Sequence, residues 1–125
     1  MRDVLVLCYH AVSPRWDATL SIPPERLAEQ LRALSRRGYR GATFVEAVTD
    51  PPHPRTVAVT FDDSYRSVNS LGRPVLDDLG WPATVFVPTA YAGAEEPRGW
   101  PGTDHWLSTE HAGELMPMSW EELGE

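Results

Sequence analysis

Two adjacent acidic residues, Asp62 and Asp63, come directly after the apolar stretch of residues 56–61. Neighbouring carboxylates repel one another, and burying both without a partner forces one of them to take up a proton. A divalent cation removes this conflict, because one carboxylate can bind the metal while the other accepts a proton from a water molecule. The alternative is that one of them only caps the helix that follows, as Asp often does. The spacing alone leaves both interpretations open.

His10 follows another apolar run, residues 4–9, in the same way. Neighbouring strands of a parallel sheet end on the same side, and ligands bind at that side. His10 could therefore stand at the rim of a site formed by Asp62 and Asp63. A histidine that is satisfied within the core is the alternative.

The other histidines offer weaker candidates. His105 and His111 are six residues apart, which places them on different faces of a helix or roughly 20 Å apart on a strand. We interpret both as surface or loop residues, and His53, which lies between prolines, as solvated.

Three aromatic residues lie near the acidic pair or in the long loop after it. Tyr65 could contact a substrate, but packing beneath the loop is the favoured interpretation. Trp100 and Trp106 could stack on sugar rings or could anchor the loop to the core.

Apolar periodicity predicts how these residues are positioned. Short apolar runs alternate with helical patterns, which is typical of a parallel α/β sheet, open or barrel-shaped. The first run, which contains Cys8, predicts a strand buried on both faces and a buried thiol. A capping box at Ser119 and Glu122 predicts the start of a helix after a long irregular segment. The expected strands are residues 4–9, 39–44, 56–61 and 83–87, the expected helices are residues 27–34, 45–48 and 68–79 with a kink at Pro74, and the irregular segment is residues 89–118.

Composition narrows the function classes. The chain has 125 residues, enough for one modest domain. Its 18 acidic residues against 11 Arg, with no Lys, leave a net charge of -7, so the basic patch of a nucleic-acid-binding protein is missing. Cys8 is the single cysteine, which excludes an intrachain disulfide. The first apolar run is too short for a membrane span or a signal segment, so we expect a cytoplasmic chain without membrane association.

The segment Thr60-Phe61-Asp62-Asp63-Ser64, with Tyr9-His10 before it and the run of residues 82–87 after it, resembles the polysaccharide deacetylase family. This family is also known as carbohydrate esterase family 4, with the chitooligosaccharide deacetylase homology domain, and its first motif reads Thr-Phe-Asp-Asp-Gly. The resemblance implies the first part of a distorted (β/α) barrel of the glycoside hydrolase/deacetylase type. It also implies removal of N-acetyl groups from an amino-sugar polysaccharide, with Asp62 as general base and Asp63 as a ligand of a divalent metal, usually zinc.

Two departures from the family pattern stand out. Ser64 replaces the glycine of the motif, and its Cβ is costly only if the backbone there needs a positive φ. The second motif, His-x-x-x-His, which supplies two further metal ligands, is missing. We therefore expect residues 1–125 to be the N-terminal portion of the domain, truncated before that motif.

Such a fragment has several possible functions. It could be part of a deacetylase, inactive by itself, or a non-catalytic remnant that binds a glycan or a protein partner through the Trp-bearing loop. A glycosidase is disfavoured, because its two carboxylates flank the bond about 5 to 10 Å apart and are not adjacent residues. An open sheet edge would also favour self-association.

Overall fold

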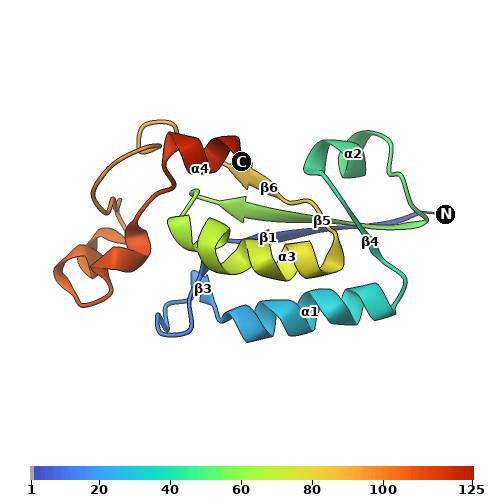
Figure 1. Ribbon diagram of the computed structural model, residues 1–125, viewed down its shortest axis with the longest axis horizontal. Helices are drawn as coiled ribbons and strands as arrows, with labels where there is room; N and C mark the ends of the chain where they lie inside the picture. Colours follow the sequence, from blue (N-terminus) through green and yellow to red (C-terminus); the bar gives the residue numbers. More distant parts are fainter. Residues whose placement is uncertain (1) are drawn as a thin grey trace.

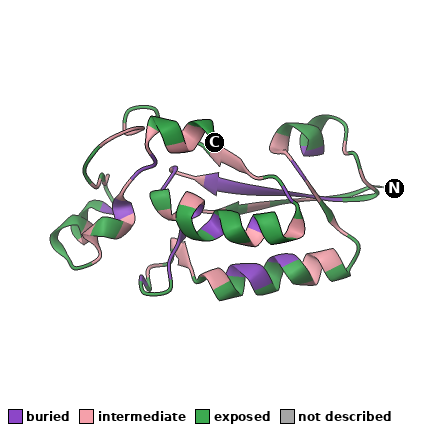
Figure 2. Ribbon diagram, in the orientation of Figure 1, coloured by how far each residue is buried: buried purple, intermediate pink, exposed green. Residues whose placement is uncertain are grey.

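A parallel four-stranded sheet forms the centre of the molecule in the computed structural model, which describes residues 2–125. The strand β5 is central, and it is buried from residue 56 to residue 61 (Figure 2). One side of β5 pairs with β1, while the other side pairs with β4 along its first half and with β6 along its second half (Figure 1). The strands are β1 (Asp3–Tyr9), β4 (Arg40–Ala42), β5 (Arg55–Asp62) and β6 (Thr84–Phe86).

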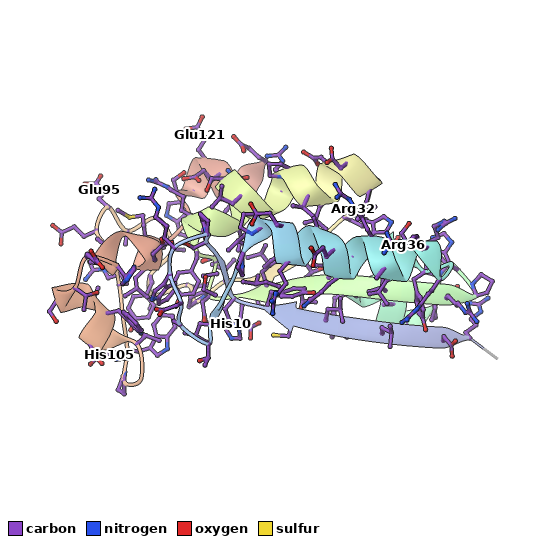
Figure 3. The ribbon with its side chains drawn as sticks, turned by 90° about the horizontal axis from the view of Figure 1, so that it is seen from below. His10, Arg32, Arg36, Glu95, His105 and Glu121 are labelled. Atoms are coloured by element: carbon purple, nitrogen blue, oxygen red, sulfur yellow. The ribbon has the colours of Figure 1, made fainter. Side chains whose placement is uncertain are left out.

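Helices connect these strands, as the alternating pattern predicted. The helices α1 and α3 lie on the same face of the sheet (Figures 1 and 3). Leu27 and Leu31 of α1 and Leu76 of α3 pack there against Val57, Val59 and Phe61 of β5. A π-helical turn, η1, precedes Pro74 where the kink was expected. The helical segments are α1 (Pro24–Arg36), α2 (Phe44–Thr49), η1 (Val68–Gly72) and α3 (Arg73–Leu79).

The strand β1 differs from its prediction. Val4 and Val6 are 38% and 47% exposed, and Cys8 is exposed as well, whereas Leu5 and Leu7 pack against the core. The expectations of a strand buried on both faces and of a buried thiol are therefore wrong. β1 is an edge strand of the sheet, and successive side chains of a strand point to opposite faces, so alternate side chains of β1 point away from the core.

Two short strands and two 3₁₀ helices were not predicted. The strands β2 (Ala11–Val12) and β3 (Ser21–Ile22) pair in parallel next to the end of β1. The irregular segment after β6 contains η2 (Asp104–Ser108) and η3 (Ala112–Leu115). The expected capping box is confirmed, since Ser119 and Glu122 exchange hydrogen bonds at the start of α4 (Trp120–Gly124).

Among residues 2–125, no helix combines the length and the apolar character needed to cross a bilayer.

Candidate functional site

The acidic pair lies at the carboxyl end of the central strand. Asp62 is the last residue of β5 and pairs with Phe86 of β6. The amide of Asp63 donates to the carbonyl oxygen of Phe86 at 3.1 Å, which extends this pairing by one residue. On the other side of β5, Tyr9 pairs with Phe61, so β1 ends beside the same turn.

A strained turn follows the strand. Asp63 has φ 72° and Ser64 has φ 49°, and both values lie in the left-handed region that favours glycine. The condition under which Ser64 is costly is therefore met. Its side chain is fully buried, and Oγ has no hydrogen-bond partner within the described residues.

Residues 116–118 hold this turn in place from the far end of the irregular segment. The amide of Met118 donates to the carbonyl oxygen of Ser64 at 2.8 Å, and the amide of Arg66 donates to that of Met116 at 2.8 Å. Between them, Tyr65 forms an isolated antiparallel bridge with Pro117. The conformation of the acidic turn thus depends on chain contributed about 50 residues later.

Three side chains converge at this edge of the sheet. His10 Nε2 lies 3.8 Å from Asp62 Oδ2, with 31% of the histidine side chain and 40% of the aspartate side chain exposed. The Cys8 thiol donates to the same Asp62 oxygen at 3.5 Å. Figure 3 shows His10 at the end of β1, well apart from His105 in the irregular segment.

Cys8 is the residue that the sequence interpretation missed. It lies two positions before His10, and residues two apart on a strand share a face. This spacing would have identified Cys8 and His10 as neighbours at the site if the sequence had also shown which face of the sheet they occupy.

Burial and neighbouring charges shift two pKa values at this edge. Burial raises the pKa of Asp63, and the charge of Asp62 adds to the increase although His10 opposes it. Partial desolvation of the exposed Cys8 thiol raises its pKa, and the hydrogen bond to Asp62 and the charge of Asp62 add to this increase. Negative charge is therefore less favourable at this edge of the sheet than in open solvent.

The structure brings together a different set of possible metal ligands from the one expected at Asp63. Within residues 2–125, the group of side chains close enough to share a metal ion is Cys8, His10 and Asp62. Asp63 is not in this group. His105 and His111 are not in it either, and both rings contact Trp106, with centroids at 5.1 Å and 5.5 Å. His53 is half-buried at the opposite end of β5.

The aromatic residues anchor the irregular segment. Trp100 stacks with Tyr65 at a centroid distance of 6.3 Å and with Tyr91 at 5.6 Å. Trp106 meets Trp16 edge-on at 5.6 Å. Tyr65 is 1% exposed, and both tryptophans pack against the buried cluster around it. The interpretation of Tyr65 as a packing residue is confirmed, and these contacts favour anchoring over sugar stacking for the tryptophans.

A hollow of about 620 Å³ lies elsewhere, beside α3, β6 and α4. Trp81, Val85 and Leu123 are among its lining residues, whereas Asp62 and Asp63 are not. The acidic turn and this hollow are therefore separate features of the molecule.

Comparison with known proteins gives consistent results. The sequence matches the family described as polysaccharide deacetylase over residues 49–123. YxkH of Bacillus subtilis (strain 168), whose name assigns it to the polysaccharide deacetylases, is 30% identical over 87 residues, which cover 66% of this chain and 30% of YxkH. The structure of IcaB from Ammonifex degensii is 31% identical with a TM-score of 0.69, and the match covers 98% of this chain and 47% of IcaB.

A de-N-acetylase from Aggregatibacter actinomycetemcomitans has a TM-score of 0.72 at 16% identity, with 96% of this chain and 48% of that chain covered, and it bears on the fold alone. These likenesses confirm the expected fold class, the first part of a distorted (β/α) barrel of the deacetylase type. The chain spans less than half of the length of each of these relatives.

Proposed function

Because the chain belongs to the polysaccharide deacetylase family, we propose that its acidic turn serves the hydrolysis of N-acetyl groups on an amino-sugar polysaccharide. The observation that carries the proposal is the position of Asp62, at the carboxyl end of the central strand with 40% of its side chain exposed. Ligands bind at this end of the strands in parallel α/β folds. A polymer can reach a partly exposed carboxylate at a sheet edge without entering a closed cavity.

Asp62 is the general base in this proposal. It accepts a proton from the water molecule that attacks the acetamide carbonyl, and the products are acetate and a free amine. His10, 3.8 Å away, is placed to orient the carboxylate of Asp62. The next two residues of the turn, Ser64 and Tyr65, are buried, which holds the turn against the sheet and keeps the base in position.

Asp63 is the residue proposed to bind a divalent metal, with zinc as the proposed ion. Its raised pKa reflects a half-buried carboxylate that a cation would stabilise. When bound at Asp63, such an ion would supply Lewis-acid chemistry, polarising the substrate carbonyl and acidifying water. Two histidines that complete such a site have no counterpart beside Asp63 among residues 2–125. We therefore propose that the two histidines belong to a part of the domain that residues 1–125 do not include, corresponding to the portion of the relatives that this chain does not span.

Acetate release from oligomers of N-acetylglucosamine, measured with zinc present, tests the proposal. We expect the release by the chain to fall about 100-fold or more in Asp62→Asn, because a positioned general base contributes at least that factor. Asp104→Asn is the matched control, since Asp104 is an exposed aspartate in η2, away from the acidic turn. Release that persists in Asp62→Asn would contradict the role of Asp62.

The second candidate is a non-catalytic chain that binds a glycan or a protein partner. Its motivation is the incomplete set of metal ligands. Absence of acetate release from the unmodified chain, with retained binding of the same oligomers, would favour it over the proposed activity. Trp100 and Trp106 already pack against Tyr65 and Trp16, which argues against glycan stacking on these two rings.

A further inference from the structure

We infer that Cys8, His10 and Asp62 form a second metal site, distinct from a site at Asp63, which takes a thiophilic divalent ion such as zinc. The three side chains offer a sulfur, a nitrogen and an oxygen, and these atoms lie within 4.8 Å of one another. Thiolate and imidazole ligands favour zinc and cobalt over magnesium and calcium, which prefer oxygen atoms alone.

The strand pairing explains why these residues meet. Cys8 is opposite Thr60 in the register of β1 and β5, and two residues further along, His10 comes beside Asp62. Because side chains alternate across a strand, both steps of two residues stay on the same face. That face is the exposed one, since Cys8 and Val6 are both exposed. An ion from solution can therefore reach the three ligands directly.

The distances fit a tetrahedral ion. With Zn–S of about 2.3 Å and Zn–O of about 2.0 Å, tetrahedral geometry separates the sulfur and oxygen atoms by about 3.5 Å. Cys8 Sγ and Asp62 Oδ2 are 3.5 Å apart. The corresponding nitrogen–oxygen separation is about 3.3 Å, and His10 Nε2 is 3.8 Å from Asp62 Oδ2. A small rotation of the histidine ring closes this difference, and the fourth position stays open for water.

The hydrogen bond between the Cys8 thiol and the Asp62 carboxylate also favours a cation between these two groups. The Cys8 thiol points its proton at Asp62, so a cation that replaces the proton is attracted by both groups. Binding forms a metal–sulfur bond and releases that proton to water.

One consequence rests on the proposed function. A metal ion held by Asp62 occupies the carboxylate that the deacetylation needs as a base. The same side chain therefore cannot serve both sites at once, and zinc in excess would act as an inhibitor.

Titration of the metal-free chain with Co²⁺ and with Zn²⁺ tests the inference without any assay of activity. We expect Co²⁺ to produce a thiolate-to-cobalt charge-transfer band in the near ultraviolet and visible bands typical of tetrahedral coordination. Cys8→Ser should abolish the charge-transfer band and weaken Zn²⁺ binding by about 100-fold. His10→Asn should weaken binding while the charge-transfer band persists at saturating Co²⁺.

Two controls separate this site from the one at Asp63. Asp63→Ala should keep the charge-transfer band, and Val6→Ser should keep both the band and the affinity, since Val6 is an exposed residue of the same strand. Circular dichroism of each variant verifies that it folds. Absence of binding, or binding that is lost in Asp63→Ala and retained in Cys8→Ser, overturns the inference. If the unmodified chain gives the expected cobalt spectrum but releases no acetate, the result counts against the proposed function alone.

Discussion

Ser64 is the residue at which the local sequence and the backbone disagree most clearly. Its φ of 49° lies where a Cβ is unfavourable by roughly 1–2 kcal/mol. The side chain is also fully buried, with no partner for its hydroxyl group among the described residues. The hydrogen bond from Met118 to the carbonyl oxygen of Ser64 helps to hold this conformation.

We therefore predict that Ser64→Gly raises the free energy of unfolding by about 1 kcal/mol, because the relief of strain exceeds the entropy that glycine gains in the unfolded chain. Urea denaturation followed by circular dichroism measures the change. Ser64→Ala is the matched control, since it removes the hydroxyl group but keeps the Cβ. An equal gain in both variants would attribute the effect to the buried hydroxyl group, and a loss in Ser64→Gly would refute the strain argument.

At the scale of elements, one carboxylate makes several of the polar contacts of the short helix α4. Glu122 closes the capping box with Ser119, and its side chain also reaches Arg66 at 3.1 Å and Asn69 at 3.4 Å. Burial alone would raise the pKa of Glu122, but the hydrogen bonds from Ser119 and the charge of Arg66 outweigh it and hold the pKa below its usual 4.5. One side chain thus joins α4 to the helical segment after the acidic turn.

We predict that Glu122→Gln lowers the free energy of unfolding at pH 7 by about 1 kcal/mol, the value typical of a lost cap. A carboxylate whose pKa is lowered by folding stabilises the protein above its unfolded pKa and loses that effect as the pH falls through the folded value. The difference from the unmodified chain should therefore shrink below about pH 4.5. Thermal unfolding at pH 7 and pH 3.5 measures it, with the exposed neighbour Glu121→Gln as control. A difference that does not depend on pH would show that the charge is not involved.

For the whole molecule, the main feature is a parallel sheet with α1 and α3 packed together on one of its faces (Figure 1). Among the described residues, the strand β1 has no pairing partner on the side opposite β5. Val4 and Val6 of this strand are exposed to solvent. Unpaired edges with exposed apolar side chains tend to pair with other chains, and lysine on such an edge opposes this pairing.

We accordingly predict that the chain self-associates through β1 and that Val6→Lys reduces this association. Sedimentation velocity over a range of concentrations should show larger species for the unmodified chain, and a shift towards monomer for the variant. The control is Val48→Lys, which changes a valine on α2 that is 54% exposed. A chain that stays monomeric at every concentration would contradict the prediction, and so would an equal effect of both lysines.

The amino-acid sequence by itself determined the local features of this protein. The alternation of apolar runs and helical patterns predicted the parallel α/β fold, and the predicted positions of β5, α1, β6 and the capping box of α4 are confirmed. Individual helices, strands and caps depend on interactions within a few residues of one another, so periodicity and capping chemistry were sufficient to predict them. The positions of Asp62, Asp63 and His10 at strand ends followed from the same patterns.

Only the tertiary structure decided which faces are covered and which distant residues meet. The apolar run of β1 could not reveal that Cys8 is exposed, because burial depends on the helices that pack on the sheet. The approach of Cys8 and His10 to Asp62 depends on strand register, and the left-handed backbone at Ser64 is held by Met118. Register and burial arise from packing between segments separated by about 50 residues, which no local pattern of side chains encodes.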